Sequence, residues 1–135
     1  MDRTTVLFIR ASLVYLAIGV VVGVLMAVWP QWIYVYRSVH VHLNLIGFMS
    51  MMVFGVGNHI LPRFSGRPLY SQEMARVQFW LANIGLIGMI LSWSFLGHRR
   101  AVAYQAFLVF FGVIEAIAIL IFVYNIQRTI RPVGG

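Results

Sequence analysis

Four long runs of apolar residues dominate this chain of 135 residues and limit its possible folds more than any other feature. The runs cover Thr5–Trp29, Val39–Leu61, Ser71–Gly97 and Ala101–Ile126. Each contains at least the ~20 residues that an α-helix needs to cross the hydrocarbon core of a bilayer. Because 61% of the residues are hydrophobic and only 10% are charged, the chain cannot cover a water-facing surface with polar side chains. The sequence predicts an all-α integral membrane protein with a single transmembrane domain over residues 1–135.

The connections between the four runs are short and rich in residues that break helices. The first contains Pro30 among tryptophans and tyrosines, the second covers residues 62–70 with two prolines and a glycine, and the third covers only residues 97–100. Such short links force neighbouring helices to run antiparallel, which predicts an up-down four-helix bundle. Ser71 is the expected N-cap of the third helix. The small residues Gly19, Gly23 and Ala27 predict a close helix contact, within the bundle or across a dimer.

The charged residues predict how the bundle lies in the membrane. Ten arginines and no lysine stand against three acidic residues, which gives a formal net charge of +7. An N-terminus inside the cell would place seven arginines on the cytoplasmic side and three outside, so we expect both termini in the cytoplasm of a prokaryote. The arginines lie at the ends of apolar runs, which disfavours nucleic acid as a partner and favours lipid headgroups. The first run is long and no small-x-small site follows it, so we expect a retained helix and not a cleaved signal peptide.

The chain has no cysteine, so a tightly held metal would need histidine, methionine or carboxylate ligands. His40 and His42 begin the second predicted helix at its outer end, and His98 ends the third helix at the same level. His59 lies 17 residues beyond His42, which is about 25 Å along a helix and near the inner face. His40 and His42 are two residues apart and point about 200° apart around the axis, so they cannot both ligate one metal ion.

Two interpretations of the outer histidines remain open. A haem b held between histidines of adjacent helices would fit them, since haem needs no cysteine. The cationic side chains of Arg37, Arg99 and Arg100 lie nearby, where they could meet the haem propionates. Alternatively, histidines at the membrane interface can simply bond to water, headgroups or backbone. Residue types and spacing do not choose between a cofactor site and a solvated interface.

Two stretches of the sequence resemble a known family. The run VHVHLNLIGF at residues 39–48, continued by FGVGNHILP at residues 54–62, resembles the second transmembrane helix of the haem–copper oxidase catalytic subunit and its nitric oxide reductase relatives. The run QFWLANIG at residues 78–85 is similar to the start of the next helix in that family. Short oxidase-subunit-I-like membrane proteins, which keep only a few of the family's helices, are the most similar group.

The resemblance implies a haem ligand in the second helix. His42 fits best, because His42-Leu-Asn44-Leu resembles the His-x-Asn-Leu of the reductase branch, and His40 is the alternative if the register shifts. The family's second low-spin haem ligand and its copper histidines lie on later helices that this chain lacks. The missing ligand would then be His98, or a histidine of a second copy, His40 or His59. The implied function is haem b-dependent electron transfer or the handling of oxygen or nitric oxide, in a homo-oligomer with a redox partner.

Glu115 lies near the middle of the fourth predicted helix, where a carboxylate must face the bundle, either protonated or paired. Arg10, in the inner part of the first helix, is its candidate partner, although such an arginine can also snorkel to the interface. The same glutamate could serve a proton relay. A rival function is a small dimeric proton-coupled or metal-ion transporter built around Glu115 and the thioethers of Met49, Met51 and Met52. A third is a cofactor-free assembly subunit, and oxidoreductase activity is left open.

Overall fold

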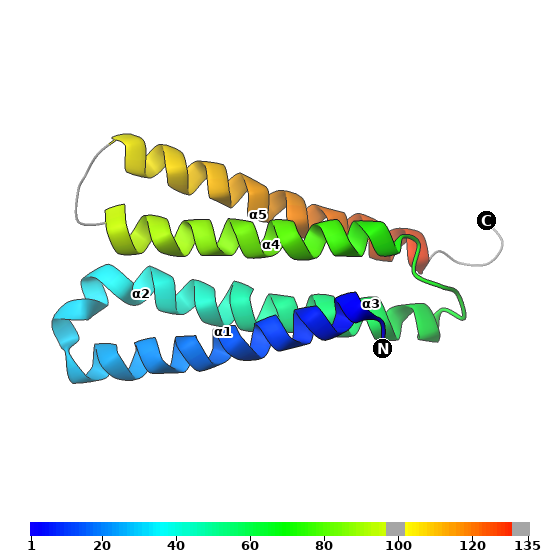
Figure 1. Cartoon of the computed structure of the whole chain (residues 1–135), viewed down its shortest axis with the longest axis horizontal. Coiled ribbons are helices and arrows are strands. Elements are labelled where there is room, and N and C mark those ends of the chain that lie inside the picture. Colours follow the sequence, from blue (N-terminus) through cyan, green and yellow to red (C-terminus); the bar gives the residue numbers. More distant parts are fainter. Residues whose placement is uncertain (97–101, 131–135) are drawn as a thin grey trace.

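A computed structural model describes residues 1–96 and 102–130, and every regular element in these ranges is helical (Figure 1). The elements are α1 (Arg3–Val28), a 3₁₀ turn (Pro30–Trp32), α2 (Ile33–His42), a π-helical segment (Leu43–Ser50), α3 (Met51–Phe64), α4 (Gln72–Leu91), a second π-helical segment (Ser92–Leu96) and α5 (Val102–Thr129). The helices alternate in direction along the chain, which confirms the all-α up-down bundle.

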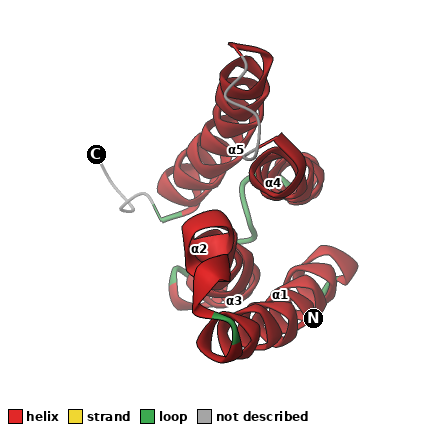
Figure 2. Cartoon of the chain, turned by 90° about the vertical axis from the view of Figure 1, so that its left-hand side faces the viewer, coloured by secondary structure: helices red, strands yellow, loops and turns green. Residues whose placement is uncertain are grey.

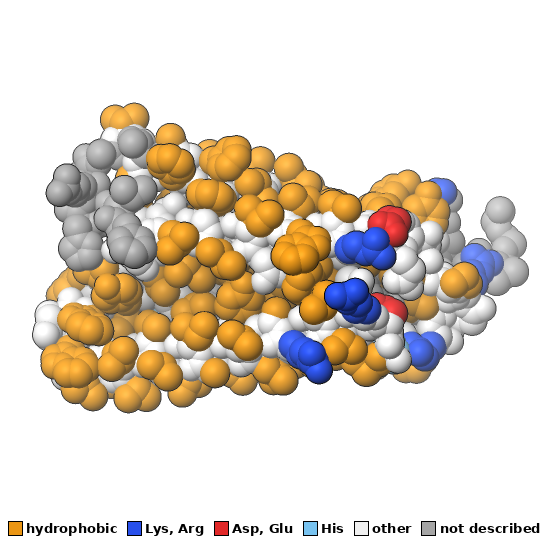
Figure 3. All heavy atoms as spheres, in the orientation of Figure 1, with side chains coloured by type: hydrophobic (Ala, Val, Ile, Leu, Met, Phe, Trp, Pro, Cys, Tyr) orange, Lys and Arg blue, Asp and Glu red, His pale blue; other side chains and the backbone are white. Residues whose placement is uncertain are grey.

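Four helices in the described ranges are long and apolar enough to cross a membrane. The candidate spans in the first and the last helix, Arg3–Val28 and Tyr104–Thr129, have 26 residues each, and the third, Gln72–Ser94, has 23. The second is longer, because the 3₁₀ turn, α2, the first π-helical segment and α3 follow one another without a break from Pro30 to Phe64, over 35 residues. Figure 3 shows hydrophobic side chains over most of the visible surface, as expected where lipid is the solvent. The protein is an integral membrane protein.

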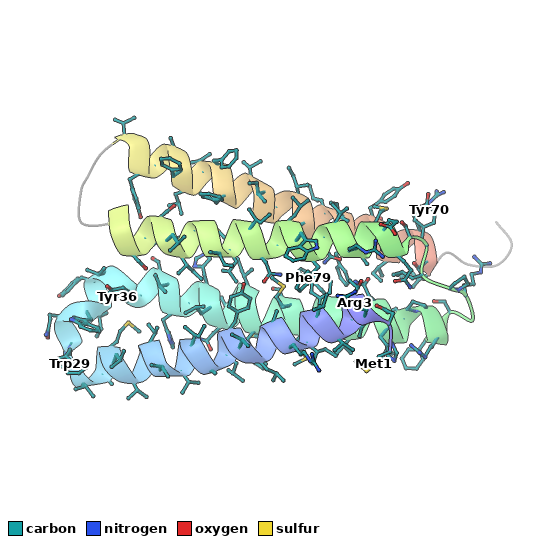
Figure 4. The ribbon with its side chains drawn as sticks, in the orientation of Figure 1. Met1, Arg3, Trp29, Tyr36, Tyr70 and Phe79 are labelled. Carbon is teal, nitrogen blue, oxygen red and sulfur yellow. The ribbon has the colours of Figure 1, made fainter. Side chains whose placement is uncertain are left out.

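The second helix begins at Ile33, six residues before the expected start at Val39. Pro30 allows this, because proline fits the first turn of a helix, where its missing N–H has no intrahelical partner. The rings of Trp29 and Trp32 lie 5.3 Å apart, and those of Trp32 and Tyr36 lie 5.6 Å apart. Because the helix starts early, most of the aromatic residues that we expected in the connection lie in the 3₁₀ turn or in α2. Figure 4 shows Trp29 and Tyr36 at the same end of the bundle. We name this the aromatic end.

The bundle consists of two helical hairpins, which Figure 2 shows end-on. The N-terminal hairpin pairs α1 with the second helix, and the C-terminal hairpin pairs α4 with α5. Glycines allow close packing, since an added Cβ at Gly47 would lie 2.7 Å from the Cβ of Tyr15. Between the hairpins, the ring of Phe8 contacts those of Phe54 and Phe79, with centroids 5.9 and 5.1 Å apart. These aromatic contacts give the two hairpins a shared buried core.

The opposite end of the bundle holds the first residues of α1 and α4 and the last residues of α3 and α5. Ser71 caps α4 by accepting a hydrogen bond of 3.2 Å from the Met74 N–H, which confirms the expected N-cap. The Asn125 side chain accepts from Ser71 N and donates to Ser71 O, at 3.0 and 2.9 Å, so the link is fixed to α5. Arginines gather here, visible as blue spheres in Figure 3 beside hydrophobic side chains. This Arg-rich end carries Arg3, Arg63, Arg67, Arg76 and Arg128.

Candidate functional site

His42 is the last residue of α2 and lies between the two hairpins. Its Nδ1 is 2.9 Å from the carbonyl oxygen of Ser38, one helical turn earlier. Its ring packs against the Trp93 ring of the π-helical segment that follows α4, with centroids 4.3 Å apart and planes tilted by 47°. A carbonyl oxygen can only accept a hydrogen bond, so Nδ1 carries the proton. The Nε2 lone pair of His42 is then available to a metal.

His40 points to the opposite side of the second helix, as the two-residue spacing predicts. Its Nδ1 lies 2.9 Å from the carbonyl oxygen of Gly19 in α1. A Cβ at Gly23 would lie 2.8 Å from its Cε1, so the ring lies in space that glycine leaves open. The Asn44 amide donates to the His40 carbonyl at 2.8 Å. His40 therefore joins the helices of the N-terminal hairpin, and the small residues of α1 serve a contact within the bundle.

The remaining residues of the expected outer site lie largely beyond the described ranges. His98, Arg99 and Arg100 lie outside the described residues, so the structure does not bear on their expected approach to His42. Arg37 is exposed on α2, five residues before His42. Within residues 1–96 and 102–130, no group of three or more His, Asp or Glu side chains is placed to hold a metal ion. A haem iron needs at most two ligands from the protein, so a haem site does not require such a group.

An apolar groove of about 680 Å³ runs between α1 and α4, beside the second helix. Val39 and Leu43 contribute to its wall, but His42, between them in sequence, does not. The Tyr15 hydroxyl donates to Oδ1 of Asn83 at 2.7 Å in this wall, which joins the two hairpins. Because His42 faces Trp93 and not this groove, the groove is no candidate for the haem site.

His59 lies at the Arg-rich end, as its distance along the helix predicts. It lines a cavity of about 420 Å³ together with residues of the link between α3 and α4. Its carbonyl oxygen accepts a hydrogen bond from the Arg63 guanidinium one turn later. His59 cannot share a metal with His42 of the same chain.

Glu115 is buried in the C-terminal hairpin, with 3% of its surface exposed. A Cβ added at Gly85 in α4 would lie 2.8 Å from the backbone N of Glu115 and 2.8 Å from its Oε2, so α4 and α5 meet closely here. Neither carboxyl oxygen has a hydrogen-bond partner in the described part of the chain. The expected pairing with Arg10 is therefore wrong, because Glu115 faces α4 whereas Arg10 is exposed on α1 beside the groove.

Two contacts of the site were not foreseen from the sequence. Trp93 covers His42, but an isolated tryptophan near a helix end is ordinary in membrane proteins and gives no signal. The second contact is the Tyr15–Asn83 hydrogen bond, which also joins the hairpins. The sequence feature that could have predicted it is the amide residue Asn83 inside an apolar run. Intramembrane polar residues usually face the bundle interior, which would have identified Asn83.

Comparison with known proteins relates this chain to respiratory oxidases. The sequence model of the family described as "Cytochrome C and Quinol oxidase polypeptide I" matches residues 1–130. The chain is 31% identical over 97 residues to the "Cytochrome c oxidase subunit 1 homolog" of Agrobacterium tumefaciens (strain T37). It is 41% identical over 49 residues to "Cytochrome c oxidase subunit 1" of Rhodobacter capsulatus, and 31% identical over 68 residues to "Cbb3-type cytochrome c oxidase subunit CcoN1" of Stutzerimonas stutzeri.

These matches cover much of this chain but little of each relative. They span 67%, 36% and 50% of this chain, in the same order, and 18%, 9% and 14% of the relatives. The matched stretches thus cover less than one fifth of the length of these curated relatives. No solved structure gives a significant match.

Proposed function

The chain belongs to the family of cytochrome c and quinol oxidase polypeptide I, and from this membership we propose that it binds haem b in the membrane. The function we propose is electron transfer, or the handling of a diatomic gas such as oxygen or nitric oxide. A bound haem would supply a one-electron carrier, and the chain's own side chains would hold and orient it. The matches cover at most 18% of each relative, so the whole activity of the relatives is not assumed for this chain.

The geometry of His42 is the observation that carries the proposal. Histidines that ligate metals commonly donate their other ring N–H to a backbone carbonyl, which fixes the tautomer and the ring orientation. His42 makes this contact with Ser38 at 2.9 Å, and the Trp93 ring packs against its imidazole. His40 has a similar hydrogen bond, but its ring lies between α1 and the second helix. We therefore propose His42 as an axial ligand, with Arg37, Arg99 and Arg100 near the propionates.

The second axial ligand is proposed to be His98 of the same chain or a histidine of a second copy. The short link between the third and fourth helices would bring His98 to the level of His42. A homo-oligomer would supply a histidine if His98 is not the ligand, and an external redox partner would exchange electrons with the haem. Oxidoreductase turnover itself is not part of the proposal.

A visible spectrum of the purified protein tests the proposal. We expect a Soret band and sharp α/β bands after reduction, typical of six-coordinate low-spin haem b. His42→Ala should abolish haem retention, and His59→Ala, at the other end of the same helix, should retain it as the matched control. His98→Ala should give a five-coordinate, high-spin spectrum if His98 is the second ligand.

Other results would redirect the assignment. If His98→Ala leaves the spectrum unchanged, the partner histidine comes from another copy, which would make the haem content depend on the oligomeric state. Normal haem binding by His42→Ala would contradict the ligand assignment. A colourless protein from cells supplied with haem would favour a cofactor-free assembly subunit.

Glu115 supports a second candidate function, a proton relay or a small dimeric proton-coupled transporter. Glu115 is a buried carboxyl group in a membrane helix and has no partner in the described part of the chain, and such a group is a functional-site candidate by default. In proteoliposomes, Glu115→Gln should abolish coupled transport without loss of folding, whereas the exposed Glu73→Gln should have no effect. Unchanged transport in Glu115→Gln would remove this candidate.

The orientation remains a proposal from the arginine distribution. The Arg-rich end is expected to face the cytoplasm of a prokaryotic cell, with both termini on that side. Reporter fusions at the two ends of the chain test this. Reporters active only outside would reverse the orientation but leave the relative positions of the sites unchanged.

A further inference from the structure

A second cavity lies at the Arg-rich end, away from His42 and Glu115. Its volume is about 420 Å³, and it lies between the start of α1, the last turns of α3 and the link to α4. The link breaks the helices at this level, with a positive φ of 62° at Gly66. The cavity therefore opens where lipid headgroups meet the protein. The polar residues that line it are Asp2, Asn58, His59, Arg63, Arg67 and Gln72.

Asn58 forms part of the cavity wall and has an unsatisfied polar atom. Only 4% of its surface is exposed, and its Nδ2 donates to Oε1 of Gln78 at 3.4 Å, but its Oδ1 has no partner among the residues that the structure describes. Turning the amide over exchanges the two atoms and still leaves one of them without a protein partner. This atom has almost no accessible surface, so the Asn58 amide must turn toward the cavity to reach a ligand. Because an unpaired buried polar group is costly, a ligand that bonds to the turned amide would be favoured. A hydroxyl group suits either orientation, because it both donates and accepts.

The remaining lining makes the cavity basic. Arg63 and Arg67 contribute two positive charges against the single carboxylate of Asp2. That carboxylate already accepts hydrogen bonds from Thr5, at 2.9 Å from the backbone N and 2.8 Å from Oγ1. Basic pockets between transmembrane helices at the membrane surface suit the headgroups of anionic lipids.

The apolar surroundings indicate that the ligand comes from the membrane. Phe64 follows Arg63 and is 85% exposed, and Tyr70 at the other end of the link is also exposed. Figure 4 shows Tyr70 at the Arg-rich end, beside the last turns of α5. Large exposed rings next to a basic cavity provide a surface for acyl chains, which a soluble anion would not need.

We propose that this cavity binds the headgroup of an anionic phospholipid that carries a free hydroxyl, of the phosphatidylglycerol class. The phosphate pairs with Arg63 and Arg67, the headgroup hydroxyl bonds to the Asn58 amide, and the acyl chains lie along Phe64. The site is separate from the proposed haem site and does not depend on it.

Native mass spectrometry of the full chain in detergent tests this, with phosphatidylglycerol, phosphatidylmethanol and phosphatidylcholine as probes. Phosphatidylmethanol keeps the phosphate charge but lacks the hydroxyl. We expect at least tenfold more retention of phosphatidylglycerol than of phosphatidylcholine. The double variant Arg63→Gln, Arg67→Gln should lose this preference. Arg76→Gln should keep it, because that guanidinium is exposed at the same end and pairs with Glu73 at 3.2 Å.

Asn58→Leu tests the hydroxyl contact separately. It should remove the preference for phosphatidylglycerol over phosphatidylmethanol and keep the preference of both over phosphatidylcholine. Far-UV circular dichroism and the melting temperature establish that each variant is folded. Equal retention of all three lipids by the wild type would overturn the proposal. So would a stabilisation by soluble glycerol phosphate equal to that by phosphatidylglycerol, because the ligand would then come from water.

Discussion

Each of the two hairpins packs an ionisable side chain against a glycine, but the two side chains differ in their hydrogen bonding. In the N-terminal hairpin, the His40 imidazole makes a hydrogen bond to the Gly19 carbonyl, and the backbone carbonyl of His40 accepts a hydrogen bond from the Asn44 amide. In the C-terminal hairpin, Glu115 meets Gly85 at similar closeness, but neither of its carboxyl oxygens has a partner within residues 1–96 and 102–130. The first centre joins a helix pair by hydrogen bonds, whereas the second holds a buried carboxyl group that makes no hydrogen bond within the described residues. Pairing, and not burial or residue type, distinguishes the structural centre from the candidate functional one.

The glycines themselves should give the largest difference between the two hairpins. Gly85→Ala would put a Cβ 2.8 Å from the Glu115 backbone N, which cannot move unless α4 and α5 separate. We expect a loss of about 2–3 kcal/mol in the free energy of unfolding, measured in detergent. At Gly19 the atom at 2.8 Å is Asn44 Nδ2, on a side chain that can turn, so Gly19→Ala should cost about 1 kcal/mol. A larger loss for Gly19→Ala would reverse the comparison.

Removing the paired imidazole should have the next largest effect. His40→Ala deletes the hydrogen bond to Gly19 and the ring that fills the space beside Gly23. We expect a loss of about 1–2 kcal/mol, since interhelical hydrogen bonds in membranes contribute modestly and lost packing adds to them. Haem retention should be unchanged if His42 is the ligand. Loss of haem with unchanged stability would make His40 the functional histidine.

The first helix of each hairpin has an N-cap, Asp2 in α1 and Ser71 in α4, and these two caps should differ in their response to acid. Partial burial would raise the pKa of Asp2 from 3.8, but the hydrogen bonds from Thr5 outweigh it and lower the pKa. Because the folded-state pKa is depressed, the cap of α1 contributes fully above about pH 4 and is lost as the pH falls through that lower value. The Ser71 cap of α4 does not titrate. Lowering the pH from 7 to 3 should destabilise the wild type more than the Asp2→Asn variant. We expect this difference in the free energy of unfolding to be about 1 kcal/mol or less, measured by thermal unfolding.

The smallest effect is expected at the unpaired carboxyl group. Glu115→Gln removes no hydrogen bond to the described part of the chain and keeps the side-chain volume. The free energy of unfolding should change by no more than about 0.5 kcal/mol. If Glu115 were paired with a buried charge, the same substitution would cost about 3–5 kcal/mol, so a loss of that size would show a partner.

The architecture could be predicted from the sequence, because the apolar runs and short links leave few arrangements in a bilayer. Membrane depth followed directly from residue number, so the separation of His59 from His42 was predicted. The direction of a side chain around its helix is harder to predict. His40 and His42 were expected on opposite sides, but the contacts to Gly19 and Trp93 depend on how the hairpins pack. The expected pair of Arg10 with Glu115 failed for this reason, since the two residues face different neighbours.

The π-helical segment Leu43–Ser50 has a consequence for how the second helix can change in evolution. A π turn holds more residues than an α turn, and it can gain or lose one residue by converting to or from α geometry. This segment separates α2, which ends at His42, from α3, which carries Asn58 and His59. A single-residue insertion or deletion there would rotate one half of the helix against the other without breaking either. The face that carries His42 and the face that lines the cavity at the Arg-rich end can therefore diverge separately. We expect any gap in an alignment with longer relatives to fall within residues 43–50.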